Sequence, residues 1–262
     1  MSYLIICAVA FAVSGLTLFS GFGLGTLLMP AFALFFPIEV AVAATAIVHL
    51  ANNIFKVILV GKKADLSIVL KFALPASVMA MVGALLLNLF TTVPPFFRYV
   101  FFGRTCTVSP EKLVIAALII VFAIMELSPR SEKLTFDAKF IPLGGALSGF
   151  FGGLSGLQGA LRTAFLSRAG LEKEAFIGTM VVSAVVVDIS RLLIYGITFF
   201  SRDFGVLKSQ GGVGMVIAGT LCAFCGAFIG SRLMKKITMR TIQIVVGVML
   251  LLVGLAIGIG LI

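Results

Sequence analysis

The chain has 262 residues, of which 61% are hydrophobic and only 11% are charged, whereas a soluble domain carries roughly 25% charged residues. Its apolar runs are continuous rather than alternating, which indicates an all-α, polytopic membrane protein and argues against a transmembrane β-barrel. The loops are too short for a soluble catalytic domain, and the net charge of +10 is that of basic loops that set membrane topology, so no nucleic-acid partner is expected.

The first apolar run, from Tyr3 to Phe36, is 34 residues long, although about 20 residues span a bilayer. Residues 14–27 read SGLTLFSGFGLGTL, and this density of glycine disfavours a continuous helix. We therefore expect a broken element, either a re-entrant hairpin or a discontinuous helix. Broken backbone at membrane depth is tolerated only where it is buried in protein or lines a cavity.

Three further spans complete the first half of the chain. They are Glu39–Val60, which ends at a basic GKK turn, Leu66–Phe90 and Lys112–Leu127. The connector 91–110 contains FFRYVFFGR, in which bulky aromatics stand beside arginines, and this pattern suits an interfacial segment. Residues 128–139 carry five charges and form the hydrophilic joint between two halves.

The glycine-rich break recurs in the second half. An offset of 134 aligns AVSGLTLFSGFGLG at 12–25 with ALSGFFGGLSGLQG at 146–159, so that Ser14 matches Ser148 and Gly25 matches Gly159. A second broken element is expected over 140–166, with its break at Gly152–Gly159. The later spans are predicted at Lys173–Tyr195, Gly214–Met234 and Thr241–Ile262, with a loop at 197–212. The chain is thus expected to consist of two membrane repeats, 1–133 and 134–262.

The distribution of basic residues favours hairpins over single crossings. If each broken element returns to its own side, the loops carry 12 basic residues on one side and 5 on the other, whereas single crossings give 8 and 9. The positive-inside rule then places both termini outside the cytoplasm. With three full crossings per half, the second half is inverted relative to the first, as in many secondary transporters.

A polar row runs along the second predicted helix. Thr45, His49, Asn52 and Lys56 lie within about 60° of one another at 100° per residue. The offset of 134 maps three of them onto a second row, Thr179, Ser183 and Ser190. Lipid penalises such faces, so both rows are expected to point inward.

Plainer roles remain open for these groups. The serines and threonines are also suited to hydrogen bonding between helices alone, and Lys56 is near enough to a helix end to snorkel. Asp188 and Arg191 are interpreted as a local ion pair on another face of their helix. His49 has an unperturbed pKa near neutrality, so it is expected to tune the pH dependence of any activity.

The two breaks themselves offer groups that bind anions. Helices that restart near Gly25 and Gly159 present unpaired amides and the positive end of the helix dipole. The substrate-binding residues expected at the breaks are Gly23, Gly25, Thr26, Ser155, Gln158 and Arg162, in addition to the row residues Thr45, His49, Asn52, Thr179 and Ser183. Arg162 is the one cation in either broken element and suits bidentate pairing with an oxyanion, although snorkelling or structural pairing is the alternative.

Several stretches make a family resemblance visible. They are SGFGLGTLLMPAF, PIEVAVAATAIV followed by the GKKADLS loop, FALPASVMAMVGALL, and FFGGLSGLQGAL. Over essentially the whole chain, these resemble the sulfite exporter TauE/SafE family of bacterial membrane permeases. The resemblance implies about eight hydrophobic segments in two related halves, in the bacterial inner membrane. It also implies transport of small anions such as sulfite, thiosulfate, taurine or sulfoacetate.

The leading hypothesis is a secondary transporter that carries a small anion, with H⁺ or another ion as coupling partner and no metal or cofactor. The sequence has no nucleotide-binding loop, so an ion gradient or the gradient of the substrate must drive transport. An anion channel is the first alternative. A second is an intramembrane serine protease, because residues 153–156 spell GLSG, with Ser155 as nucleophile and His49 as base. The oligomeric state is left open.

Overall fold

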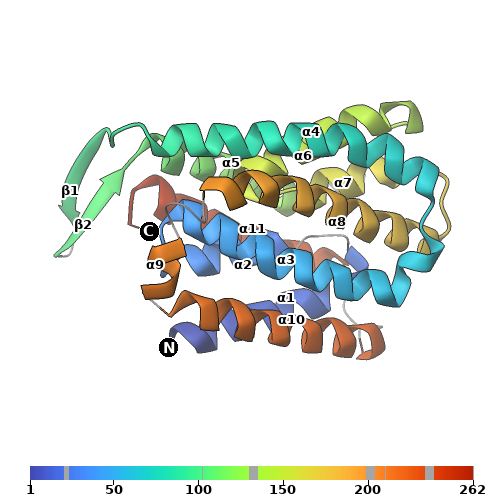
Figure 1. The fold of residues 1–262 in the computed structure, drawn as a ribbon, viewed down its shortest axis with the longest axis horizontal. Helices are drawn as coiled ribbons and strands as arrows, with labels where there is room; N and C mark the ends of the chain where they lie inside the picture. Colours follow the sequence, from blue (N-terminus) through green and yellow to red (C-terminus); the bar gives the residue numbers. More distant parts are fainter. Residues whose placement is uncertain are drawn as a thin grey trace.

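The structure is a computed structural model that describes residues 1–20, 24–101, 103–129, 135–198, 204–209, 211–233 and 239–261. It is an all-α bundle, as the composition predicts, with one two-stranded hairpin in the described part (Figure 1). The elements of the first half are α1 Ser2–Ser20, α2 Leu24–Ala33, α3 Ile38–Val60, the short 3₁₀ turn η1 Gly61–Lys63, α4 Leu66–Thr91, β1 Phe97–Phe101, β2 Arg104–Val108 and α5 Pro110–Leu127. Those of the second half are η3 Ala138–Phe140, α6 Ile141–Ser155, α7 Gly159–Leu166, α8 Lys173–Thr198, α9 Phe204–Ser209, α10 Gly212–Leu233 and α11 Met239–Gly258.

Four of the predicted spans are confirmed as long apolar helices. Among the described residues, Ile38–Lys63, Leu66–Thr91, Lys173–Ile197 and Gly212–Gly230 are long and apolar enough to cross a membrane. The other two predicted spans, α5 and α11, pack along each other, and α11 contributes a shorter apolar stretch, Gln243–Gly258. Exposed leucines on α4, Leu66, Leu70 and Leu74, recur every four residues, which is the pattern of a helix face that meets lipid.

Both broken elements fold as hairpins that return to the end where they start. The Tyr3 hydroxyl, at the start of α1, donates a hydrogen bond of 3.2 Å to the carbonyl of Gly211, and Phe36, just after α2, lies against Gly212. In the second half, Phe136 precedes α6 and stacks on Phe165 near the end of α7, with 4.1 Å between ring centroids. The hairpin interpretation of each broken element is therefore confirmed, and single crossings are excluded.

The two ends of the bundle hold different segments. The N-terminus, the C-terminus and the β1–β2 hairpin lie at one end, and η1 with the start of α8 lies at the other (Figure 1). At the first end, the Tyr99 hydroxyl donates to the carbonyl of Ile259 at 2.5 Å. At the second end, Lys63 of η1 forms an ion pair with Glu174 of α8. The basic GKK turn thus lies opposite the termini, as the charge count predicts.

Two connectors are more ordered than the sequence indicates. The segment expected to be an interfacial connector contains the antiparallel pair β1–β2, in which Tyr99 lies opposite Cys106. Aromatic and β-branched residues in FRYVF and RTCTV favour strands, and Gly103, at φ 74°, allows the tight turn between them. The loop expected at 197–212 contains the short helix α9.

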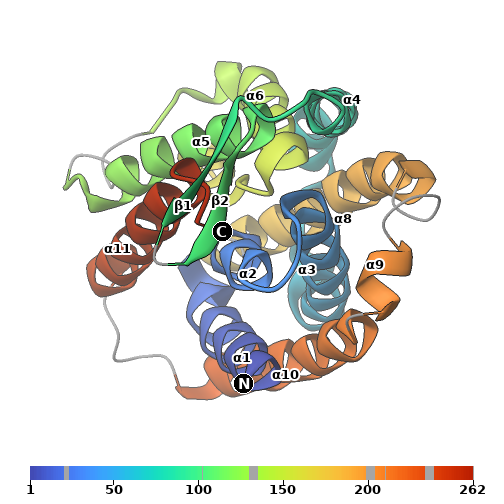
Figure 2. The same cartoon turned by 90° about the vertical axis from the view of Figure 1, so that its left-hand side faces the viewer.

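Helices from the two halves pack in reciprocal pairs. α1 lies along α10, and α6, the helix that aligns with α1 at the sequence offset of 134, lies along α4 (Figures 1 and 2). α3 packs on α8, and α5 packs on α11. α2 lies inside the bundle, with all ten of its residues buried (Figure 2). If every helix is replaced by the helix that aligns with it at the offset of 134, the same set of pairs results.

Most glycines of the second apolar run serve packing rather than breakage. A Cβ at Gly145, Gly149 or Gly153 would collide with the backbone of α4, at Phe72, Ala76 and Ala80 respectively. Small residues at every fourth position allow close helix contact, which is how helices associate in lipid. The predicted break at Gly152–Gly159 is therefore too long, because α6 continues to Ser155 and the break covers only residues 156–158.

The topology is testable by cysteine accessibility. In a variant whose four native cysteines are replaced, Lys62→Cys and Lys139→Cys should both react with an impermeant maleimide from the cytoplasmic side. Arg98→Cys, in the β1–β2 hairpin, should react only from the periplasmic side. Labelling of positions 62 and 139 from opposite sides would contradict the arrangement of the two hairpins.

Candidate functional site

The two breaks meet in the interior of the bundle. A Cβ built on Gly25, in the first turn of α2, would lie 3.2 Å from the carbonyl oxygen of Gly156 in the second break. The same point lies 3.7 Å from a methyl carbon of Thr45 and 3.8 Å from the imidazole of His49 on α3. The start of α2 therefore fits between the second break and the polar row of α3, and a side chain there would force them apart. Gly23 lies outside the described residues.

The second break is held by hydrogen bonds from its own helices. Gly156 ends α6 in the left-handed conformation, at φ 81°, and its N–H donates to the Gly152 carbonyl at 2.9 Å. The Ser148 hydroxyl donates to the carbonyl of Gln158 at 2.9 Å, which ties the start of α7 back to α6. No side-chain hydrogen bond caps α7, so its first amides face the break without a side-chain partner.

Asp188 of α8 is the centre of a buried polar cluster formed by His49, Asn53, Gln158, Asp188 and Arg191. Its Oδ2 lies 2.5 Å from His49 Nδ1 and accepts from Asn53 Nδ2 at 3.2 Å. Its Oδ1 accepts from Gln158 Nε2 at 3.0 Å and from Arg191 Nε at 3.0 Å. Asp188 and Arg191 are both fully buried. One carboxylate thus joins α3, α8 and the second break.

The ion pair between Asp188 and Arg191 is confirmed, with 2.8 Å from Arg191 Nη2 to Asp188 Oδ1. The expectation that this pair lies away from the central groups is wrong. It rested on a single inward face of α8, but Thr179, Ser183 and Asp188 are all fully buried, so α8 is enclosed on several sides. The signal that could have identified Asp188 is the rule that an ionisable residue inside a span marks a functional site.

Arg191 and Tyr195 also stabilise the end of α6. Arg191 Nη1 donates to the Gly152 carbonyl at 3.1 Å, and the Tyr195 hydroxyl donates to the carbonyl of Gly153. The Gly153 carbonyl is among those that a helix end leaves without partners in the helix itself, whereas the Gly152 carbonyl also accepts from the Gly156 amide. Sequence reasoning gave neither residue this role, because the acceptors are backbone atoms that no side-chain pattern reveals.

The predicted site residues are divided among several places. His49 and Gln158 belong to the polar cluster, and the Asn52 side-chain oxygen accepts from the Ser14 hydroxyl at 3.1 Å. Thr179 lies elsewhere, because its hydroxyl accepts from the Asp65 amide at 2.9 Å near the start of α4. Ser155 donates to the carbonyl of Phe151 at 2.9 Å, within its own helix.

Several buried donors in this region have no hydrogen-bond partner. They are Thr45 Oγ1, Asn52 Nδ2, Ser183 Oγ, and Arg162 Nε and Nη1. Buried polar groups are nearly always hydrogen-bonded, so unpaired donors clustered near a break indicate a place for a ligand or for water. Three of the five atoms belong to residues that are fully buried, and Arg162, which carries the other two, is only 4% exposed.

Lys56 and Arg162 are two buried cations near the cluster. Each is only 4% exposed, so Lys56 does not snorkel to the membrane surface as the sequence allowed. They are close enough for their positive charges to repel each other. Among the described residues, Asp188 is the one carboxylate that acts on Arg162, none is found to act on Lys56, and Asp188 directly contacts Arg191. The interior therefore has more positive than negative charge.

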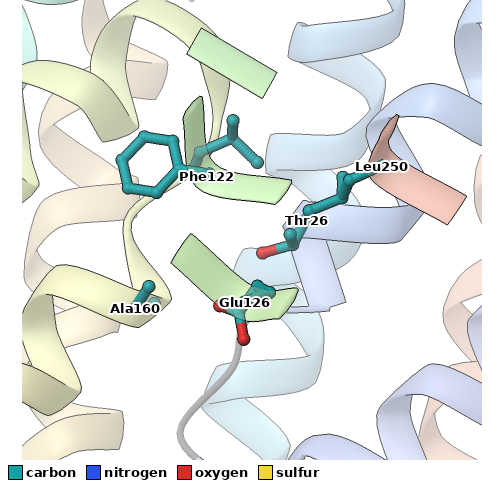
Figure 3. Close-up of a pocket in the computed structure, with 7 residues that line it drawn as sticks. Thr26, Phe122, Glu126, Ala160 and Leu250 are labelled. Carbon is teal, nitrogen blue, oxygen red and sulfur yellow. The ribbon is translucent and has the colours of Figure 1, made fainter. Parts of the chain in front are cut away.

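A small cavity borders the second break (Figure 3). It is lined by Thr26, Phe122, Glu126, Leu157, Gly159, Ala160 and Leu250. About 10 Å³ is open to the centre of a water molecule, which is room for about one water. Thr26 is the one predicted site residue that lines it. Sequence reasoning missed Glu126, although an acid within a predicted span, Lys112–Leu127, was a signal for it.

Neutralising Asp188 should destabilise the bundle. Asp188→Asn keeps the shape of the side chain but leaves Arg191 buried without a counter-charge, and breaking such a pair costs about 3–5 kcal/mol. We expect a clearly lower midpoint of thermal unfolding in detergent. Asp137→Asn is the control, because the Asp137 ion pairs are exposed and should contribute less than about 1 kcal/mol. Equal midpoints for the two variants would contradict the central role of Asp188.

Comparison with known proteins agrees with this architecture. A model of the family described as "Sulfite exporter TauE/SafE" matches residues 6–257, which is nearly the whole chain. Comparisons with curated proteins and with solved structures gave no match. The resemblance noted in the sequence is thus confirmed, and with it the assignment to multi-pass membrane transporters. The chain belongs to the TauE/SafE family of sulfite exporters.

Proposed function

We propose that this protein is a secondary transporter of a small sulfur oxyanion or organosulfonate, such as sulfite, thiosulfate, taurine or sulfoacetate, in the bacterial inner membrane. The observation that carries the proposal is the pair of buried cations, Lys56 on α3 and Arg162 on α7, whose charges act on each other. Arg162 has two guanidinium nitrogens without partners. Buried charge without a counter-charge is strongly unfavourable, so a bound anion is the natural complement.

The position of the two cations defines the expected binding region. Arg162 follows Gln158 by four residues, or about 6 Å along α7, and Lys56 follows His49 by seven, or about 10 Å along α3. Both helices run from the cluster toward the η1 end of the bundle (Figure 1). The anion is therefore expected beside the polar cluster on its η1 side, not in direct contact with Asp188, which would repel it.

Neutral donors complete this region. Asn52 Nδ2 and Ser183 Oγ are buried without partners, on α3 and α8 respectively. They are suited to donate hydrogen bonds to anion oxygens without adding fixed charge. A site with cations on one side and neutral donors on the other discriminates in favour of anions and still permits release, which a transporter requires.

We infer that the halves 1–133 and 134–262 are inverted repeats. The reciprocal helix pairs, α1 with α10 and α6 with α4, support this relation. So does the start of each half, because α1 begins at one end of the bundle and α6 at the other (Figure 1). Rocking of one repeat against the other around the breaks would expose the site alternately to the two sides of the membrane.

The charge count supports an orientation with both termini in the periplasm and the η1 turn in the cytoplasm. The coupling ion is proposed to be H⁺. A channel is less well supported, because the cavity beside the breaks has room for about one water only. A protease is also disfavoured, because the Ser155 hydroxyl donates to the carbonyl of Phe151 within its own helix.

Arg162→Gln should weaken anion binding at constant fold. Loss of a charged hydrogen bond corresponds to roughly 1.5–3 kcal/mol, or about a ten- to 150-fold higher Kd for thiosulfate by titration calorimetry. Arg168→Gln is the matched control, because Arg168 is exposed and its one ion pair within the described residues is with Asp137, at 3.8 Å. An unchanged Kd for Arg162→Gln would place the anion elsewhere.

Gly25→Ala tests the contact between the breaks. The added methyl group would lie 3.2 Å from the Gly156 oxygen, so the two hairpins must separate by a few tenths of an ångström. We expect thiosulfate flux in proteoliposomes to fall at least tenfold, and Gly25→Val to abolish it. Gly205→Ala in α9 is the control, because nothing lies within 4 Å of its added carbon. Full flux in Gly25→Val would show that the breaks do not shape the site.

A further inference from the structure

Glu126 is a buried acid that the polar cluster does not use. It lies in the last turn of α5, is only 3% exposed, and points into the cavity (Figure 3). Its Oε2 has no hydrogen-bond partner. A carboxylate held away from water with one oxygen unpaired is unfavourable, and taking up a proton removes that penalty.

The cavity brings Glu126 to the starts of both returning helices. Thr26 belongs to the first turn of α2, and Gly159 and Ala160 open α7. Helix starts carry unpaired amides and the positive end of the dipole, so they favour a negative charge. Arg162, which belongs to the proposed anion site, follows the start of α7 by about one turn.

One charged group faces Glu126 among the described residues, Arg240 of α11. Its guanidinium donates to the backbone carbonyls of Glu126 and Leu127, at 3.3 and 2.7 Å, rather than to the carboxylate. The other elements at the cavity present the Thr26 hydroxyl, backbone and the apolar side chains Phe122, Leu157 and Leu250. An ionised Glu126 would thus be stabilised by the positive ends of α2 and α7 and, without direct contact to the carboxylate, by Arg240.

We propose that Glu126 is the proton-binding group that couples anion transport to H⁺. When ionised, the carboxylate interacts with the positive N-terminal ends of α2 and α7. When an anion binds at Lys56 and Arg162, its negative charge disfavours the ionised carboxylate at the start of the same helix α7, so Glu126 takes up a proton. This inference rests on the proposed transport function and assigns its coupling step to one residue.

The linkage between the two ligands fixes the sign of the pH effect. If binding one anion takes up one proton, anion affinity rises as pH falls, by about tenfold per pH unit while Glu126 is ionised in the free protein. By reciprocity, the anion raises proton affinity by the same factor. Anion and proton therefore move in the same direction.

The test is calorimetric titration of the purified protein with thiosulfate, whose own charge does not change near neutral pH. Titrations in buffers of different ionisation enthalpy give the protons taken up for each anion bound. We expect about one for the wild type and none for Glu126→Gln, whose affinity should no longer depend on pH. Glu111→Gln, at the other end of α5, is the control and should behave as the wild type.

Each outcome decides between the two proposals. Binding without proton uptake in the wild type, or unchanged uptake in Glu126→Gln, would overturn the role of Glu126 and leave the transport function standing. Loss of uptake in His49→Gln alone would assign the proton to His49 instead. If thiosulfate, sulfite, taurine and sulfoacetate all fail to bind at any pH, both proposals fall.

A second measurement keeps the wild-type protein informative if Glu126→Gln does not fold. Dicyclohexylcarbodiimide reacts with protonated carboxyl groups in apolar surroundings. Mass spectrometry of labelled wild-type protein should locate the adduct at Glu126, with yield that rises as pH falls. Absence of labelling at Glu126 at every pH would contradict the proposal.

Discussion

The buried carboxylate of Asp188 is the interaction on which the interior of this protein depends. A charge in a low-dielectric interior must be matched by hydrogen bonds and a counter-charge, or the chain will not bury it. Asp188 receives these from α3, from its own helix and from the second break, through His49, Arg191 and Gln158. The requirement therefore fixes the relative positions of three elements that no apolar contact would place so specifically.

Glycine has two separate tasks around this centre. Along α6 it removes side chains so that the backbone of α4 can approach, at Gly145, Gly149 and Gly153. Lipid gives helices no hydrophobic reason to associate, and close packing of small residues supplies the attraction instead. At Gly156 the task is conformational, because φ is 81° and a residue with a side chain would be strained there. Gly25 belongs to neither class, because it makes room for the other break.

These separate tasks explain how far the sequence could predict the structure. The fold class, the returning hairpins, four of the spans and the family followed from hydropathy, charge asymmetry and repeated motifs. The extent of the second break could not be predicted, because the sequence does not distinguish a glycine that allows close helix packing from one that ends a helix. The place of Asp188 was also missed, because a helical wheel assigns one inward face and α8 is buried on several. Thr179 was placed in the site by the internal repeat, but its hydroxyl accepts from the Asp65 amide instead.

The distribution of charge links the two sides of the breaks. Near α7, Lys56 and Arg162 give the interior an excess of positive charge, and among the described residues Asp188 is the one carboxylate that acts on Arg162. At the cavity, Glu126 is a buried carboxyl group with one unpaired oxygen, and Arg240 is the one charged group in the described part of the chain that acts on it. The charges are balanced in neither place, and both places adjoin the same short helix, α7. A mobile anion and a mobile proton together would balance both sides, and either one alone would leave the other side unpaired. In this arrangement, the coupling between the two ligands follows from charge balance.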